Sequence, residues 1–261
     1  MMQVELKKSR RRVADVSILG TTQLHLRNPY VIAWWSATVP GFGHLLLSKY
    51  LRGYVLILWE MVINTQAKIN LSMVYAFTGR FEMSKDALDL RWMLLYAPVY
   101  IFAIYDSYRT TVDLNKIYIL AEREKAEYTT FQISPLEINY LDKRTPWVAV
   151  IWSVVMPGMG QLYIHRIVTA FYLLGVWILI CYQSHVLEAI HYTLMGDFTK
   201  ATTVVKAEWF LFIPSVYFFA IYDAYTNTVE NNKLFDKEQS QFLKSHYQMQ
   251  KAKKILKEMR V

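Results

Sequence analysis

The stretch FAIYDSYRTTVD, residues 102–113, recurs as FAIYDAYTNTVE at residues 219–230. An offset of 117 residues extends this match through two halves of the chain without a gap. The identical positions include Pro29 and Pro146, Trp35 and Trp152, Ser36 and Ser153, Trp92 and Trp209, and Asn115 and Asn232. Chance does not keep one register for so long. We therefore interpret the chain as a duplicated domain, because each unit is far longer than a solenoid repeat of about 20–50 residues.

The composition indicates a membrane protein. The chain is 54% hydrophobic and 19% charged, and its apolar residues form runs such as VTAFYLLGVWILIC (168–181) and WFLFIPSVYFFAIY (209–222). Runs of this kind are typical of membrane helices, whereas the alternative, a tyrosine-rich core in water, would need polar faces within them. Eight Trp and nineteen Tyr suit the two membrane–water interfaces. The formal charge of +8 favours basic tails on the cytoplasmic side over nucleic-acid binding.

The predicted fold class is all-α, a polytopic membrane protein built from two tandem repeats. We divide the chain into a basic N-terminal tail (1–27), repeat unit 1 (28–112), a charged linker (113–144), repeat unit 2 (145–229) and a basic amphipathic C-terminal tail (230–261). Each unit contains three hydrophobic segments, at 29–47, 53–77 and 92–108 and again at 146–164, 166–190 and 209–225. The apolar residues of the tail indicate an amphipathic basic helix that could lie on anionic lipid or bind a partner, and a solvated cytoplasmic tail is the alternative. These residues are Phe235, Phe242, Leu243, Tyr247, Ile255, Leu256 and Met259.

The first segment of each unit is interrupted by a predicted structural turn. Its residues are Pro40, Gly41 and Gly43 in unit 1, and Pro157, Gly158 and Gly160 in unit 2. Proline removes a helix donor and glycine permits a tight bend, so this segment is either a kinked span or a re-entrant hairpin. Re-entrant hairpins would place 23 of the 29 Lys and Arg residues on the cytoplasmic side, against 18 if all six segments span. The positive-inside rule therefore favours two parallel units with four spanning helices, and with both termini in the cytoplasm.

The last hydrophobic segment of each unit ends at an aspartate, which is Asp106 in unit 1 and Asp223 in unit 2. Only fourteen residues, or about 21 Å of helix, separate Trp92 from Asp106 and Trp209 from Asp223, so each acid is expected near the inner boundary. The candidate partners of Asp106 are His44, Lys49, Arg52 and Arg109. The candidate partners of Asp223 are Gln161 and Arg166. We expect a structural latch onto the turn; a proton or ligand site and unpaired interfacial solvation are the alternatives.

Glu60 is another acid inside an apolar run, VLILWEMVI. The equivalent position in unit 2 is Trp177, so Glu60 does not belong to the duplicated plan. Lys68 and His44 are its candidate partners, and lining a cavity is the alternative.

The turn of unit 2, in SVVMPGMGQLYIHRIVTAFYLL, resembles the bacterial small two-transmembrane-helix domain family, whose mark is a Pro-Gly-x-Gly-Gln-x-Tyr turn. Unit 2 matches at Pro157, Gly158, Gly160, Gln161, Tyr163 and Arg166. Unit 1 departs from the pattern with His44 and Leu46. The resemblance implies a bacterial inner-membrane protein and no particular reaction.

No motif for catalysis or cofactor binding is present. The chain has no phosphate-binding GxxxxGK[ST] loop, no HExxH and no GxSxG elbow. Its lone cysteine, Cys181, excludes an internal disulfide and a cysteine-based metal cluster. We therefore expect no enzyme, cofactor or metal, but a scaffold, assembly factor or accessory subunit that contacts the lipid bilayer and binds a protein through the linker and the tail. The alternatives are a small transporter or channel-like protein that uses Glu60, Asp106 and Asp223, and, less favoured, an enzyme that acts on lipid.

Overall fold

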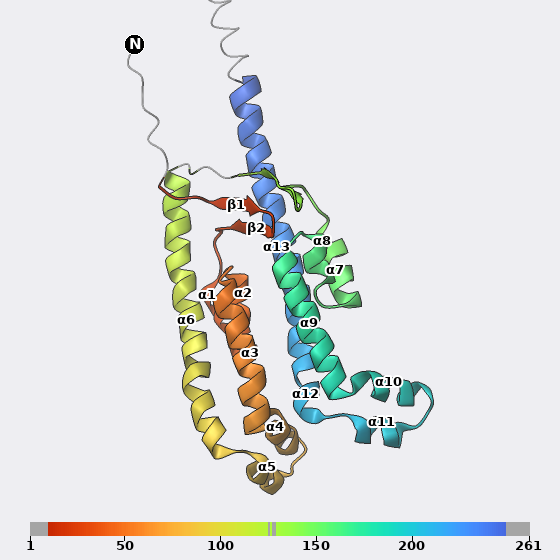
Figure 1. Cartoon of the computed structure of the whole chain (residues 1–261). Helices are drawn as coiled ribbons and strands as arrows, with labels where there is room; N and C mark the ends of the chain where they lie inside the picture. The colour runs from red at the N-terminus through yellow and green to blue at the C-terminus, as the bar shows by residue number, and fades with distance from the viewer. Residues whose placement is uncertain (1–9, 125, 127–128, 249–261) are drawn as a thin grey trace, which may run out of the picture.

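The computed structural model describes residues 10–124, 126 and 129–248. The described part is mostly helical, which confirms the all-α class, with two short β-hairpins. Its four long helices are α3 (Tyr50–Ala67), α6 (Leu90–Arg123), α9 (Ile167–Ser184) and α13 (Phe212–Leu243). Figure 1 shows these helices along one axis, with both hairpins at one end. We call this the hairpin end.

The first hydrophobic segment of each unit forms two short helices. These are α1 (Pro29–Thr38) and α2 (Phe42–Leu46), and later α7 (Pro146–Val155) and α8 (Met159–Tyr163). The chain turns between them at Gly41 and Gly158, with φ of 107° and 102°. A Cβ at Gly41 would collide with the backbone of Gly53, so the turn requires glycine both for its φ and for close packing.

The second segment of each unit is broken rather than continuous. Lys68 follows the last residue of α3, and His185 follows the last residue of α9. Each has φ of 56°, a left-handed conformation that ends a helix. Short helices follow at the end opposite the hairpins: α4 (Ile69–Phe77), α5 (Phe81–Ala87), α10 (Val186–Leu194), α11 (Phe198–Val204) and α12 (Ala207–Phe210). The predicted segments 53–77 and 166–190 therefore each contain a helix and a reversal.

The positions of the elements recur along the chain. The bounds of α1 to α5 reappear 117 residues later, residue for residue, as those of α7 to α11. Details recur as well, since the Tyr100 hydroxyl donates to Ala37 O at 2.6 Å and the Tyr217 hydroxyl donates to Val154 O at 2.6 Å.

Two antiparallel hairpins lie where the sequence predicted only a basic tail and a charged linker. The first joins β1 (Ala14–Ser17) to β2 (Gly20–Gln23), and the second joins β3 (Phe131–Ile133) to β4 (Ile138–Tyr140). The first hairpin buries Ala14 and Val16 in a cluster with Leu234 of α13. The N-terminal segment is thus bound to the second half of the chain.

One core joins the two halves. The ring of Phe42 from α2 stacks on Phe219 from α13, with centroids 4.0 Å apart. Trp35 of α1 contacts Phe219 at 5.4 Å and Tyr222 at 5.0 Å. Aliphatic side chains of α3, α9 and α13 complete this core. The halves are therefore packed together by aromatic contacts rather than merely connected.

Helices α6 and α13 continue well beyond the two aspartates. The described part of the C-terminal tail is helical and continues α13, which runs on to Leu243 and is followed by a π-helical turn, η1 (Lys244–Gln248). No proline or glycine lies between Pro214 and Gln248 to end it. Ile255, Leu256 and Met259 lie outside the described residues.

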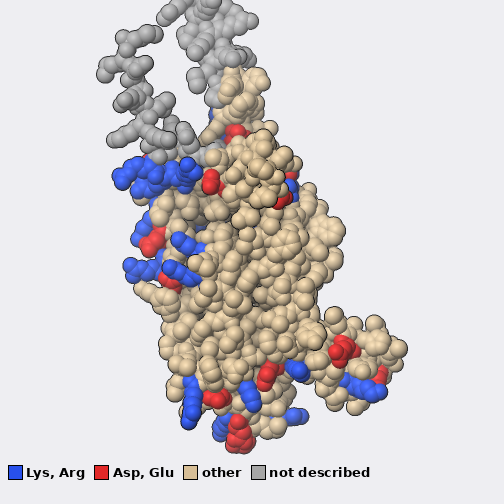
Figure 2. Space-filling model, viewed as in Figure 1, with Lys and Arg blue, Asp and Glu red and all other residues tan. Residues whose placement is uncertain are grey.

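By length and hydropathy, one described helix, α9, could cross a membrane. The number rises to three if each bent pair, α5 with α6 and α11 with α12–α13, forms one span. Helix α3 is equally long, but Arg52, Glu60 and Asn64 lower its mean hydropathy. Figure 2 shows Lys, Arg, Asp and Glu near both ends of the visible face, with a band between them that is free of these residues.

Candidate functional site

Asp223 lies at the centre of a buried polar cluster at the hairpin end, formed with Arg166, Gln161 and Asn227, which we call the Asp223 cluster. The carboxylate is fully buried. Arg166 donates from Nη1 to both carboxylate oxygens at 2.6 Å. The Nε2 of Gln161 donates at 3.0 Å, and Nδ2 of Asn227 donates at 2.8 Å. Charge pairing together with several donors is what a buried carboxylate requires.

The turn after α8 positions two members of this cluster. Gln161 lies on α8, and Arg166 is the N-cap of α9. His165 between them has φ of 59°, and the Arg166 amide donates to Gln161 O at 2.8 Å. This reversal directs the side chains of Gln161 and Arg166 toward α13, where the amide and the guanidinium both reach the carboxylate of Asp223.

Asp106 forms a similar but more open cluster with His44 and Arg52, the Asp106 cluster. The Nε2 of His44 lies 3.0 Å from Oδ2 of Asp106, and Nη1 of Arg52 donates to the same oxygen at 2.5 Å. His44 is fully buried, whereas the Arg52 side chain is 53% exposed. Of the two other candidates, Arg109 donates instead to the Tyr105 hydroxyl at 3.2 Å, and Lys49 is not among the contacts of Asp106.

The two clusters use different residues for the same geometry. His44 and Gln161 occupy equivalent positions, and each places Nε2 at 3.0 Å from its aspartate. Their second polar atoms, His44 Nδ1 and Gln161 Oε1, are both buried and without a hydrogen-bond partner. The cations come from different positions, because Arg52 is equivalent to Thr169 and Arg166 is equivalent to Lys49. His44 in place of the glutamine of unit 2 therefore preserves a nitrogen atom at hydrogen-bond distance from the acid.

Glu60 lies in a separate buried cluster toward the other end of α3. Its Oε1 accepts from Asn64 Nδ2 at 2.9 Å and from the Tyr96 hydroxyl at 3.3 Å. Asn64 also contacts Asn70, which donates to Glu208 O at 2.8 Å. The candidate partners Lys68 and His44 are not among these contacts. The second oxygen, Oε2, is buried and has no partner.

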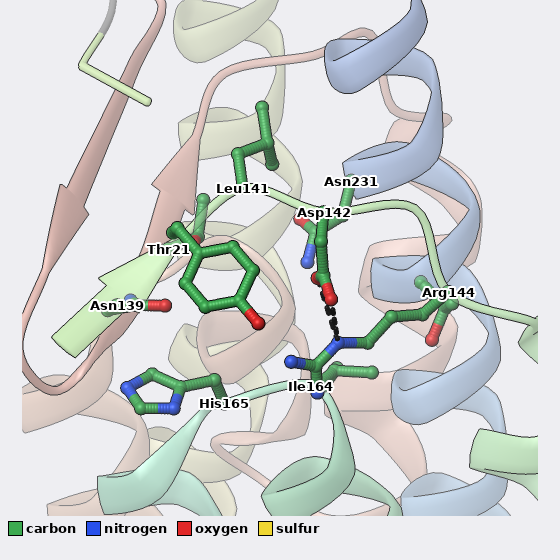
Figure 3. Close-up of a pocket in the computed structure, with 10 residues that line it drawn as sticks. Thr21, Asn139, Leu141, Asp142, Arg144, Ile164, His165 and Asn231 are labelled. Carbon is green, nitrogen blue, oxygen red and sulfur yellow. Dashed lines mark hydrogen bonds and ion pairs between the residues drawn. The ribbon is translucent and has the colours of Figure 1, made fainter. Parts of the chain in front are cut away.

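A cavity of about 200 Å³ lies beside Arg166, under the first hairpin. Its lining comprises Ser17, Leu19, Gly20, Thr22, Tyr50, Arg166, Val168 and Thr169. A second pocket, of about 10 Å³, has room for about one water molecule. Figure 3 shows that pocket, with Asp142 directed toward Arg144 and with His165 nearby. In the second pocket, His165 Nε2 lies 3.0 Å from Ile18 O.

The sequence reasoning missed Asn227, Asn64 and Tyr96. Asn227 lies four residues after Asp223 in the same helix, and Asn64 lies four residues after Glu60, so the one-turn spacing could have identified both. Tyr96 had no such signal, because its contact joins two helices.

Within the described ranges, no group of three or more His, Cys, Asp and Glu side chains could hold a metal ion. Cys181 is a buried free thiol. Comparison with family models, with curated proteins and with solved structures gave no match. The described site contains two carboxylates paired with cations, Asp223 and Asp106, and one carboxyl group with an unpartnered oxygen, Glu60.

Proposed function

We propose that this protein is a non-enzymatic integral membrane scaffold, an assembly factor or accessory subunit, which binds a protein at its hairpin end. The bilayer would surround the band that Figure 2 shows free of charged side chains. Helix α6 has 34 residues, or about 51 Å, which exceeds the ~30 Å hydrocarbon core. Its surplus length would project beyond the membrane together with the end of α13.

The same geometry supports a parallel arrangement of two repeat units in the bacterial inner membrane. Helix α1 has ten residues, or about 15 Å, which is too short to span. With α1–α2 and α7–α8 re-entrant, each unit crosses twice, and both termini and the linker lie in the cytoplasm. The recurrence of element bounds at 117 residues supports an origin by duplication. The turn chemistry supports descent from the small two-transmembrane-helix family.

The observation on which the scaffold function rests is the outer face of the second hairpin. Phe131 pairs with Tyr140 and Ile133 pairs with Ile138, and all four side chains are exposed. Asn139 instead faces inward and donates to Ser17 O at 2.7 Å. A hairpin that turns Asn139 inward and exposes its apolar side chains is a surface suited to a partner.

The aspartate clusters fit a structural role in this proposal. Asp223 fixes the α8–α9 turn to α13, and Asp106 fixes the α2–α3 turn to α6. Each cluster would hold a re-entrant hairpin against a spanning helix, so the membrane part would be rigid.

Cysteine accessibility tests the membrane placement. In a Cys181→Ser background, single cysteines replace Ser134 in the linker, Ser240 in α13 and Thr199 in α11. With an impermeant thiol reagent and intact cells, we expect only Thr199→Cys to react. Reaction of Ser134→Cys without Ser240→Cys would show inverted units and would refute the parallel arrangement.

Photocrosslinking tests the binding function. A photoreactive amino acid at Ile133 is expected to give a discrete protein adduct in cells, whereas the same residue at Phe198, which is exposed at the opposite end, is expected to give none. Absence of any protein adduct at Ile133 would argue against a scaffold that uses this face.

Glu60 supports a second candidate, proton-coupled transport. A buried carboxyl group with an unpartnered oxygen and no cation among its hydrogen-bond partners is costly to ionise, and such groups inside membranes often serve ion pathways. Glu60 shares no hydrogen-bond partner with Asp106 or Asp223 among the described residues, which weighs against one continuous path. If transport is the function, Glu60→Gln would leave a stable protein that no longer dissipates an imposed pH gradient in vesicles. Equal proton flux in the variant and the parent would exclude this candidate.

A further inference from the structure

We propose that the partner at the hairpin end is a second copy of this chain, which docks head to tail by repeating the contact that already joins the two units. This inference deepens the proposed function by naming its partner, and it rests on the proposed duplication. The residues that form the internal contact have counterparts 117 residues away, and these counterparts are exposed.

The internal contact joins one face of unit 1 to a different face of unit 2. Trp35 of α1 lies against Phe219 and Tyr222 of α13, at 5.4 and 5.0 Å between ring centroids. Phe219 is fully buried, and it also stacks on Phe42 of α2 with centroids 4.0 Å apart. We call the Trp35 side the donor face and the Phe219–Tyr222 side the acceptor face.

Each unit carries both faces, but the chain uses only one of each. The donor residue of unit 2 is Trp152, identical to Trp35, and it is 47% exposed. The acceptor residues of unit 1 are Phe102 and Tyr105, identical to Phe219 and Tyr222, and they are 55% and 56% exposed. The same three aromatic residue types that form the internal contact therefore remain available at the two outer edges.

The hairpins repeat this asymmetry outside the membrane part. The first hairpin (β1–β2) buries Val16 in a cluster that contains Leu234. The equivalent residues are Ile133, which is 69% exposed, and Ile117, which is 38% exposed. The apolar face of the second hairpin is thus the counterpart of a face that the first hairpin buries on the neighbouring unit.

A backbone contact at the hairpin tip supports the same register. Leu19 O accepts from the amide of Ile167, the first residue of α9, at 3.1 Å. The equivalent pair is Leu136, which is 87% exposed, and Tyr50, the first residue of α3. In a second copy docked equivalently, Leu136 would reach that uncapped helix start.

The symmetry of the contact decides the kind of assembly. Donor and acceptor faces differ, so the contact is heterologous, and it forms a ring if the rotation between units closes. Parallel units related by an axis along the membrane normal keep every copy in the bilayer. An isologous dimer, in which one face meets itself, does not follow from this geometry.

Cysteine crosslinking tests the contact directly. The full chain with Cys181→Ser carries Trp152→Cys and Phe102→Cys together, and a short bifunctional maleimide is applied to native membranes. We expect covalent dimers and higher multiples from the double variant and none from either single variant, because donor must meet acceptor. Dimers from a single variant would indicate an isologous contact and would overturn the proposal.

A second measurement avoids dependence on those two sites. We expect Phe131→Asp with Ile133→Asp to lower the dimer fraction at least tenfold in native mass spectrometry, with the protein still folded. The control is Phe198→Asp with Phe81→Asp, two exposed residues at the opposite end, which is expected to leave association unchanged. A monomeric parent chain would refute self-association. A crosslink at Ile133 to a protein of another mass, without self-crosslinks, would refute this inference and leave the scaffold function standing.

Discussion

At the residue scale, the two aspartates differ in how much they depend on their partners. Asp223 and Arg166 are both almost completely removed from solvent, whereas Arg52 beside Asp106 is half exposed. Removing one member of a buried ion pair leaves the other charge uncompensated, while an exposed pair is screened by water.

We therefore expect Asp223→Asn to destabilise the protein by about 3–5 kcal/mol, because Arg166 would remain buried without its counter-charge. The matched change Asp106→Asn is expected to cost about 1 kcal/mol or less. Chemical denaturation of the detergent-solubilised protein measures both changes. Equal costs would show that the burial difference between the clusters has no energetic consequence.

His25, which lies before α1, provides a pH-dependent contribution to stability. Burial, together with the nearby charges of Arg27 and Lys233, lowers the pKa of His25 from 6.5 to about 3. Its Nδ1 is buried without a partner. The unfolded chain thus binds this proton near pH 6.5, whereas the folded chain binds it only near pH 3.

The folded state is therefore expected to lose stability as the pH falls from about 6.5 toward 3, and to be unaffected by this group above 6.5. Replacing His25 by Gln should flatten the dependence of the unfolding midpoint on pH over that interval. The check is a series of thermal denaturations of parent and variant. An equally steep decline in the variant would assign the effect to other groups.

At the element scale, the glycine turns decide where the short helices reverse. A Cβ at Gly158 would meet the side chain of Leu174 and the backbone of Ala170, and φ there is 102°. Gly196 also has a positive φ, of 81°, but its surroundings are open. The two positions separate steric collision from backbone strain.

Gly158→Ala is accordingly expected to cost more than 3 kcal/mol or to prevent folding, because strain and collision add. Gly196→Ala should cost about 1 kcal/mol, from strain alone. Membrane abundance and the denaturation midpoint of the two variants give the comparison. Similar values for both would mean that the α7–α8 turn can shift to make room.

At the scale of the whole molecule, the packing between units depends on aromatic rings that have exposed counterparts. Phe219 of α13 is fully buried against α1 and α2, while the equivalent Phe102 of α6 is 55% exposed on the outer edge. The same substitution at both positions therefore separates internal packing from contact with lipid or a second copy.

We expect Phe219→Ala to destabilise the single chain by about 2 kcal/mol, which is less than in water because, in the proposed membrane placement, lipid would solvate the ring in the unpacked state. Phe102→Ala should leave the unfolding midpoint of the monomer nearly unchanged and weaken association of copies. Denaturation in dilute detergent, followed by native mass spectrometry, distinguishes the two effects. A large loss of monomer stability from Phe102→Ala would mean that this ring is already packed.

The sequence by itself determined the features that arise from local composition and from self-comparison. Apolar runs without charges predicted helices, Pro40, Gly41 and their counterparts predicted reversals, and the 117-residue offset predicted element bounds that recur. These properties depend on nearby residues or on identity between positions, both of which one chain displays. Placing each turn at the same depth as its aspartate gave candidate partners that include the observed ones, Gln161 and Arg166 for Asp223, and His44 and Arg52 for Asp106. It could not separate the last two from Lys49 and Arg109.

Only the tertiary structure decided which equivalent residues are buried. Trp35 and Trp152 are identical in type, yet Trp35 is packed against Phe219 of the other half while Trp152 is 47% exposed, because the contact between the two halves covers only one of them. The hairpins likewise depend on the neighbouring unit for their burial, and the contact of Glu60 with Tyr96 joins separate helices. A periodic sequence cannot encode such differences locally, since burial is a property of the assembled pair of units.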